Sequence, residues 1–355
     1  MMDFVDINVY SDDEEVPVRK QRVLRERINH FEKWDRKEFL QRFRLSPQTV
    51  LNIADEIQED IHHKTNRNAA LSPTDQLLLT LSFYATGSFL RVAGDFIGVH
   101  KSTASKTVKR VSEALASLRP VCIRMPETNE EISECKAGFY RIARFPLCIG
   151  SIDCSHVKII SPGGENAEIY RNRKQYFSFN VQTVADSDLK IRDIVARWPG
   201  SAHDAHIFRS SAIGHKFENK HYGNCIIVGD SGYPVKPYLM TPLRQTRNLP
   251  ENLYNESLIR TRNVVERSYG VWKKRFPGLA LGLRLKKETV QAVIVATAVL
   301  HNIACEERED IPQINVEEVV AIDLVNNNPP ENNPQLIERP NNVRQRLIFD
   351  YFARL

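Results

Sequence analysis

Two short apolar runs that each end on an aspartate constrain this chain more than any other feature. Residues 145–153 read Phe-Pro-Leu-Cys-Ile-Gly-Ser-Ile-Asp, which predicts a buried strand that ends at Asp153. Residues 224–230 repeat the pattern and end at Asp230. Carboxylates rarely stand where a core strand meets water unless they are paired, capped or bound to a cation. Two such strands side by side would hold both carboxylates at one edge of a sheet, which is the arrangement of a divalent-metal site.

Two further acids fall in predicted helices. Asp204 stands at the predicted start of a helix, and Glu266 lies in the second half, residues 260–276, of a helical region predicted to begin at Pro250. Four acids brought together would repel one another and raise at least one pKa, and a bound cation resolves that conflict. Ligand oxygens without a His or Cys cluster favour Mg²⁺ or Mn²⁺. Hard metals held by a few carboxylates serve phosphate chemistry, so these acids predict a metal site for phosphodiester cleavage.

Each of the two helical acids also has a purely structural interpretation. Glu266 can form an ion pair with Arg262 or Arg267 on the same helix. Asp204 can simply complement the dipole at the start of its helix. The sequence leaves both alternatives open.

The surroundings of Glu266 are basic. From Arg260 to Lys287 there are nine Lys or Arg residues and one acid, Glu266. A lone carboxylate in a basic helix suits a groove for a polyanion with a metal ligand in its floor. The predicted DNA contacts in this segment are Arg262, Lys273, Lys274 and Arg275.

The order of the predicted elements indicates a mixed α/β sheet. Residues 176–184 and 190–198 alternate in polarity and predict a hairpin. A helix from residue 201 and the strand that ends at Asp230 follow them. Three strands, a helix and a fourth strand are typical of a mixed α/β sheet.

The segment 72–118 predicts three helices, the last two joined by a tight turn near Gly98. This is a helix-turn-helix pattern, whose last helix carries basic residues on its outside. A plain helical bundle with a solvated basic face explains the same pattern. The predicted DNA contacts here are Lys101, Lys106, Lys109 and Arg110.

Composition excludes several classes of protein. The longest apolar segment, residues 290–300, is about half as long as a bilayer-spanning helix requires, so we expect a core helix and no membrane. The six cysteines form no C-x-x-C pair, which favours reduced thiols and gives no support to a zinc ribbon. The N-terminus has no basic region followed by an apolar one, so we expect no secretion signal.

Four blocks of sequence, in this order, resemble those of the PIF/Harbinger transposases, and most closely the transposase-derived nucleases of animals. The blocks are residues 150–156, 198–204, 228–234 and 264–276. The resemblance implies a core like that of RNase H with Asp153, Asp230 and Glu266 as catalytic triad. Thirty-five residues lie between Asp230 and Glu266, a spacing that many such transposases share. The resemblance also matches Asp204 to a further acidic position of the family, so we expect all four acids to be metal ligands.

The chain departs from the family pattern at a few positions. Cys154 and Ser155 stand where these transposases commonly have Gly and Thr, and Tyr269 and Trp272 replace Phe and Leu. These changes leave the acids intact. They therefore cast doubt on whether the protein still mobilises a transposable element more than on whether it binds metal.

The expected organisation combines these predictions. A flexible charged tail occupies residues 1–30, a helical domain with the helix-turn-helix-like segment 31–145, and the RNase H-like DDE nuclease domain 146–310. A linker follows over 311–340, and a short C-terminal helix over 341–355.

Three functions from different classes fit the residues. The first is a metal-dependent endonuclease of transposase descent, domesticated or still mobilising an element. The second is a DNA-binding or scaffold protein that keeps the acids without cutting. The third is a serine protease, because Gly229-Asp-Ser-Gly232 imitates a nucleophile motif. It ranks lowest, since no His and Asp partner context is evident.

Partners and location follow from the resemblance. It implies DNA as substrate and a separate Myb/SANT-like DNA-binding protein that carries the nuclease into the nucleus. We therefore expect the protein in nucleus and cytoplasm, and the sequence leaves its oligomeric state open. The densest basic cluster, residues 273–275, lies in the predicted catalytic helix and is a poor import signal. The basic run from Arg19 to Arg27 is the next candidate.

Overall fold

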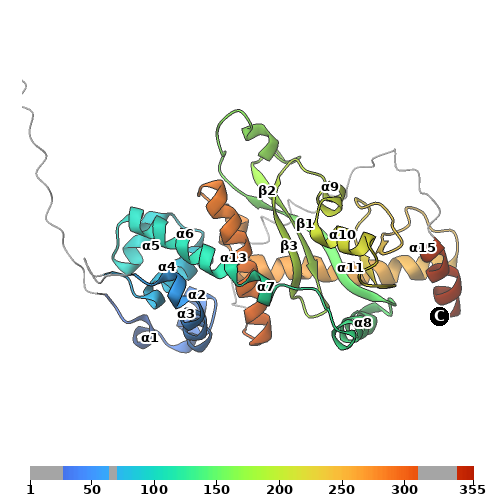
Figure 1. Ribbon diagram of the computed structural model, residues 1–355, viewed down its shortest axis with the longest axis horizontal. Coiled ribbons are helices and arrows are strands. Elements are labelled where there is room, and N and C mark those ends of the chain that lie inside the picture. Colours follow the sequence, from blue (N-terminus) through green and yellow to red (C-terminus); the bar gives the residue numbers. More distant parts are fainter. Residues whose placement is uncertain (1–26, 64–69, 311–341) are drawn as a thin grey trace, which may run out of the picture.

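The computed structural model describes residues 27–63, 70–310 and 342–355 (Figure 1). Within these ranges a group of helices lies beside a five-stranded mixed sheet, which carries helices of its own. This mixed α/β architecture is the predicted one and is consistent with an RNase H-like core. The predicted tail up to residue 26 and the whole predicted linker, 311–340, lie outside the described residues.

The first helices begin and end where the local sequence predicts. The hydroxyls of Ser46 and Ser72 accept from backbone N–H groups three residues on, and a proline follows each of them at the first helical position. Gly87 ends its helix in the left-handed conformation. The helices of this region are α1 (His30–Lys33), α2 (Arg36–Phe43), α3 (Pro47–Ile61), α4 (Pro73–Thr86), α5 (Leu90–Ile97), α6 (Lys101–Ser117), α7 (Arg119–Cys122) and α8 (Asn129–Ala143).

The connection between α5 and α6 turns at Gly98, which has a φ of 77°. His100 caps α6 by accepting from the Ser102 backbone. Two helices joined by a short turn are present, but this arrangement does not test contact with DNA. The helix-turn-helix interpretation stays a prediction.

The sheet has the order β3-β2-β1-β4-β5. Its first three strands are antiparallel neighbours, whereas β4 and β5 run parallel to β1. Alternation along β4 sends Ile226 and Val228 to one core cluster and Ile227 to another, so this strand is covered on both faces. The strands are β1 (Cys148–Lys158), β2 (Ser178–Ala185), β3 (Ile191–Pro199), β4 (Ile226–Val228) and β5 (Leu239–Met240).

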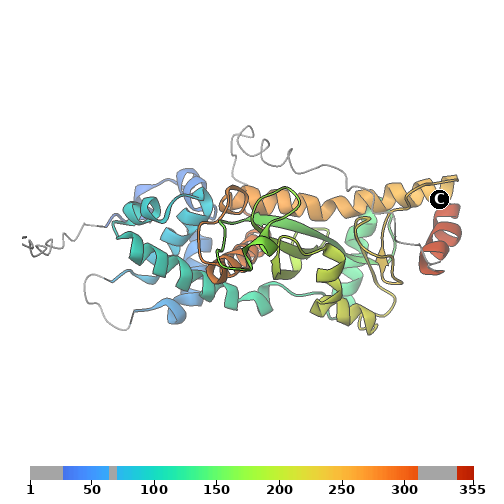
Figure 2. The ribbon, with the colours of Figure 1, turned by 90° about the horizontal axis from the view of Figure 1, so that it is seen from above.

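Helices cover the two faces of the sheet (Figure 2). The long helix α11 lies along one face, and α9 and α10 lie on the other. The remaining elements are η1 (Ala167–Tyr170), α9 (Asp204–Arg209), α10 (Ala212–Glu218), α11 (Leu249–Arg275), α12 (Gly278–Leu281), α13 (Lys287–Glu306) and a C-terminal helical segment formed by α15 (Asn342–Arg346), η2 (Leu347–Tyr351) and η3 (Phe352–Arg354).

Helix α13 joins the helical region to the sheet (Figure 1). One continuous apolar cluster contains residues of α4 and α6, of α13 and of strands β2 and β3. By length and composition alone α13 could cross a membrane, but most of it is buried inside the protein, as in a core helix. The helical region and the sheet therefore share a core across the predicted boundary at residue 145.

One predicted boundary differs from the structure. Strand β1 does not end at Asp153 but continues to Lys158, because β2 pairs with it along residues 151–158. This neighbouring strand supports residues whose local pattern is weak. The helical region predicted from Pro250, with 260–276 as its second half, is confirmed as one helix, α11, which begins at Leu249.

Candidate active site

The register of two parallel strands brings the two strand aspartates together. Ser151 of β1 pairs with Val228 of β4. Asp153, still within β1, and Asp230, just beyond the end of β4, each follow two residues later, so they stand at the same level along the two strands. The prediction that these strands lie side by side is thus confirmed by the sheet order.

Asp153 is held in a setting that disfavours its charge. Removal from water and the nearby charge of Asp230 raise the pKa of Asp153 to about 8, with Asp204 adding to the effect. The backbone N–H of Cys154 donates to its carboxylate at 2.7 Å, which opposes the shift only in part. Without a cation, this carboxyl group therefore carries a proton near neutral pH.

Asp230 and Asp204 complete a group of three interacting aspartates. Burial raises the pKa of Asp230, and the charges of Asp204 and Glu266 raise it further. Asp204 is the first residue of α9, as predicted, and its carboxylate accepts from the side-chain amide of Asn180 at 2.9 Å. Asp204 thus stands at the start of a helix and also within electrostatic reach of the strand aspartates.

Glu266 lies on α11 and forms an ion pair. Its carboxylate lies 2.7 Å from the guanidinium of Arg262, one turn earlier. This is the ion pair that the sequence offers as the structural alternative. Glu266 is also half exposed, so its side chain can change partner without disturbing the core.

Tyr269 fixes α11 on the sheet, a role that its sequence position does not reveal. Its hydroxyl donates to the backbone carbonyl of Asp153 at 2.6 Å and accepts from Thr183 at 2.9 Å. Ser151 adds a hydrogen bond to the carbonyl of Arg262. The sequence identified Tyr269 only as a departure from the phenylalanine that the resemblance predicts there, and a phenylalanine would lack the hydroxyl.

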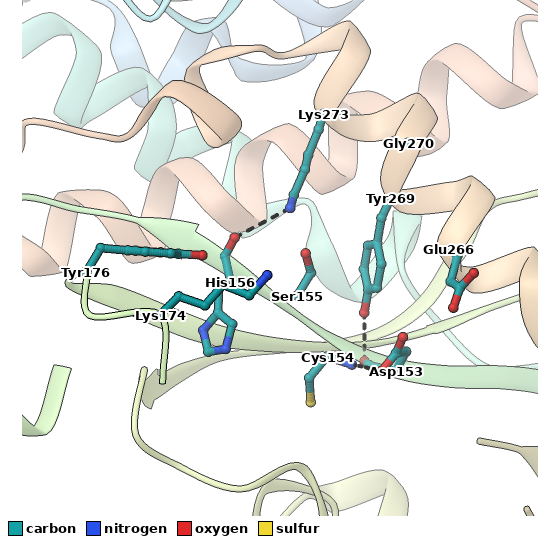
Figure 3. Close-up of a pocket in the computed structure, with 10 residues that line it drawn as sticks. All are labelled: Asp153, Cys154, Ser155, His156, Lys174, Tyr176, Glu266, Tyr269, Gly270 and Lys273. Atoms are coloured by element: carbon teal, nitrogen blue, oxygen red, sulfur yellow. Dashed lines mark hydrogen bonds between the residues drawn. The ribbon is translucent and has the colours of Figure 1, made fainter. Parts of the chain in front are cut away.

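A pocket of about 250 Å³ opens between β1 and α11 (Figure 3). Asp153 and Glu266 line one part of it, and Lys174 and Lys273 line another. The Lys273 ammonium group points to the backbone carbonyl of His156, at 3.5 Å. Lys174 comes from the loop between β1 and β2, and no sequence pattern marks it. The pocket places carboxylates and ammonium groups side by side, which suits a phosphate and its counter-cation.

The remaining predicted DNA contacts have different environments. Lys101, Lys106 and Lys109 are exposed on α6, with Lys109 3.7 Å from Glu113. The guanidinium of Arg110 instead donates to Gln76 at 2.6 Å. Lys274 is partly exposed.

The prediction for Arg275 is wrong. This side chain is 1% exposed, and its guanidinium donates to the backbone carbonyls of Arg44, Glu309 and Asp310. It links the end of α11 to the helical region. Contact with DNA would require that junction to open.

The four acids fit a metal site only in part. Among the described residues, no group of three or more His, Cys, Asp or Glu side chains is gathered closely enough to hold an ion. Asp153 and Asp230 nevertheless fit a hard cation, because each offers carboxylate oxygens and has a pKa raised by burial and by neighbouring acidic charges. Glu266 fits only if it exchanges Arg262 for the cation.

Comparison with known proteins places these residues within one family. A family model described as "DDE superfamily endonuclease" matches residues 152–302, which include all four acids. The human protein "Putative nuclease HARBI1" is 32% identical over 267 residues, which cover 74% of this chain and 76% of the human protein. Its bovine counterpart is 30% identical over 313 residues, 86% of this chain and 88% of its own length.

A plant protein is also similar. The Arabidopsis thaliana protein named "Protein ALP1-like" is 28% identical over 247 residues, 62% of this chain and 59% of that protein. No solved structure matches the chain at a significant level. The resemblance to Harbinger-type proteins is therefore confirmed by sequence comparison.

Proposed function

Since the chain belongs to the Harbinger-derived nuclease family of DDE superfamily endonucleases, we propose that it hydrolyses phosphodiester bonds of DNA with a divalent metal ion, Mg²⁺ or Mn²⁺. One observation carries this proposal. The parallel register of β1 and β4 sets Asp153 level with Asp230, where removal from water and neighbouring acidic charges raise both pKa values. A nearby cation would relieve that cost.

In the proposed site, Asp153 and Asp230 would hold the metal, and Glu266 would join them after release from Arg262. Asp204 would act from the start of α9. A bound divalent metal supplies an activated water and neutralises charge on the leaving oxygen. The protein's own contribution is to position the strand and the DNA. Tyr269 holds the Asp153 backbone, and Lys174 and Lys273 attract the phosphate to the pocket.

The direct test is cleavage of a labelled DNA duplex by the purified protein with Mn²⁺, with and without a chelator. We expect cleavage that depends on the metal. Cleavage that persists at full rate in the chelator would contradict the proposal.

A second candidate function has an observation in its favour. The ion pair between Arg262 and Glu266, at 2.7 Å, neutralises the carboxylate that a nuclease would need as a ligand. A DNA-binding scaffold could keep this pair permanently. The effect of Mn²⁺ on the melting temperature distinguishes the two functions. If the protein is a nuclease, Mn²⁺ binding should raise the melting temperature, and Glu266→Gln should reduce that rise. If it is a scaffold, neither effect should occur.

We also propose that the protein is domesticated, that is, it serves its host and no longer moves an element. The departures at Cys154 and Tyr269 from the transposase pattern support this. The genomic test is the sequence that flanks the gene. Intact terminal inverted repeats on both sides would contradict domestication.

Nuclear entry through a partner is proposed on the same family resemblance. The basic cluster at 273–275 cannot serve as an exposed import signal, because Lys273 and Arg275 are buried. The other basic run, from Arg19, lies outside the described residues up to residue 26. Expressed alone, the protein should remain largely cytoplasmic, and coexpression with a Myb/SANT-like partner should move it to the nucleus. Strong nuclear accumulation of the protein by itself would contradict this.

A further inference from the structure

Phe89 occupies a position where the fold gives its ring no role. It is the residue before α5, the N-cap, and it is 62% exposed. N-caps favour Ser, Thr, Asp and Asn, whose oxygens accept from the first backbone N–H groups. Phe89 forms no side-chain cap hydrogen bond. The side chain thus neither caps the helix nor fills the core, although an exposed aromatic ring is costly to keep in water.

A cation lies against this ring. The guanidinium carbon of Arg284 is 4.4 Å from the ring centroid of Phe89, and Arg284 is itself exposed. Val92, one turn along α5, and Leu281 of α12 are also more than half exposed. Leu281 packs against Gly87, two residues before Phe89. This surface therefore has an aromatic ring, an apolar surround and a guanidinium group.

A series of contacts connects this surface to the pocket. Gly282, two residues before Arg284, lies against the side chain of Lys158, because a Cβ added at Gly282 would stand 3.2 Å from Cγ of Lys158. The ammonium group of Lys158 in turn lies 5.8 Å from the ring of Tyr176, which lines the pocket. Two cations, Lys158 and Arg284, thus lie between the aromatic ring of Tyr176 at the pocket and that of Phe89 at α5.

We propose that this surface, formed by Lys158, Arg284 and Phe89, binds the single-stranded part of a DNA substrate next to the cleavage site, with an unpaired base stacked on Phe89. The proposal rests on the proposed action on DNA and adds the chemical form of the substrate. Bases stack on exposed aromatic rings, and arginine strengthens such contacts. Lys158 and Arg284 match the charge of the phosphates on either side of that base.

An unpaired base is the occupant that the geometry favours. Within a duplex both faces of a base are covered by its neighbours, so a protein ring can stack only on a base that has left the stack or stands at a frayed or single-stranded end. A ring fixed at a helix terminus is already ordered and loses little entropy on binding.

The test measures binding of two DNA probes without metal, so that no cleavage occurs. One probe is a blunt duplex, and the other is the same duplex with a short single-stranded extension. Wild-type protein should bind the extended probe more tightly. Phe89→Ala should reduce affinity for the extended probe about tenfold and affinity for the blunt one little, whereas Phe89→Tyr should retain the preference.

Two controls make the result specific. Phe349→Ala removes another exposed phenylalanine, 54% exposed in the C-terminal segment, and should leave both affinities unchanged. A melting curve of each variant shows whether the fold is intact. Lys158→Ala should lower the salt dependence of binding by about one unit of slope.

The outcomes separate this inference from the proposed function. If wild type cuts DNA but Phe89→Ala binds both probes as wild type does, the stacking surface is overturned and the nuclease proposal stands. An equal reduction in affinity for blunt and extended probes would also overturn it, because a base-stacking site must discriminate between them. If wild type binds neither probe, both proposals fail.

Discussion

Two buried polar regions of this protein differ in how their groups are satisfied. At the junction of α13 with β3, Asn302 donates to the carbonyls of Ile191 and Cys122 and accepts from the Ile191 backbone. His301 lies beside it and bonds the Leu189 carbonyl. Arg275 reaches three backbone carbonyls where α11 meets the helical region. The protein itself supplies partners for most of the polar atoms of these three side chains, and only His301 Nδ1 and Arg275 Nε have none among them, so these side chains serve the fold.

Asp153 and Asp230, at the level where β1 and β4 lie side by side, have few partners within the protein. Asp153 has one backbone donor and is surrounded by like charges, which together with burial raise its pKa to about 8. A fold that needed this carboxylate only for stability would pair it with a cation of its own. Buried polar groups that have partners within the protein therefore indicate a structural role, whereas buried acids that repel one another indicate a binding site for a cation.

The largest effect should come from the aspartates. Asp153→Asn or Asp230→Asn should lower the cleavage rate by about a thousandfold or more, because each removes a negative metal ligand. The melting temperature should hold or rise, since the amide removes repulsion. Cleavage assays and thermal melts measure both.

Asp193→Asn is the matched control, because Asp193 is another mostly buried acid, 3.8 Å from Arg119. It should keep cleavage. Loss of the melting transition in the Asp153 and Asp230 variants would show that these residues are structural caps. The two buried polar regions would then not differ in role.

Arg275 should show the reverse behaviour. Arg275→Met removes the donor of three partly buried hydrogen bonds from the 1% exposed guanidinium and should lower the free energy of unfolding by about 3 to 4 kcal/mol. Its neighbour Lys274, partly exposed, should tolerate Ala within about 0.5 kcal/mol. Urea unfolding compares them. Equal stability of both variants would show that the hydrogen bonds of Arg275 contribute nothing.

His301 should make the free energy of unfolding depend on pH. Burial lowers the pKa of His301 to about 4, below the value near 6.5 of an unfolded histidine. The neutral form is favoured in the folded state, so this stability is complete above pH 6.5 and is lost as pH falls from 6.5 toward 4, by about 3 kcal/mol in all.

Unfolding titrations between pH 7.5 and 4 test this. His301→Gln should flatten the dependence in that window, and the exposed His221→Gln should leave it unchanged. A wild-type curve that is flat over the window would show that His301 is not kept neutral.

The smallest effect should come from α6. Lys106 and Lys109 are exposed, and changing both to Ala should weaken DNA binding and make it less sensitive to salt. The slope of log affinity against log salt should fall by about one unit for each phosphate that is no longer neutralised. Arg110→Ala should instead affect stability, because its guanidinium holds Gln76. An unchanged slope would favour the plain helical bundle.

Much of the site was readable in the sequence because its signals are local. An apolar run followed by an aspartate can be recognised without any tertiary information, and the pattern occurs at Asp153 and at Asp230, although β1 itself continues past Asp153. The mixed α/β class and most helix boundaries follow from caps and periodicity in the same way. The sequence alone also determined the family, since four blocks in a fixed order carry the resemblance.

The direction of each side chain, by contrast, depends on how the elements pack together. Lys273, Lys274 and Arg275 are adjacent cations of the same helix, and the sequence treats them alike. Successive residues of a helix are rotated by about 100°. Lys273 therefore lines the pocket, Lys274 is partly exposed, and Arg275 is buried against the helical region. Likewise, only the pairing of Ser151 with Val228 sets the two aspartates level, because register is a property of two strands and not of either alone.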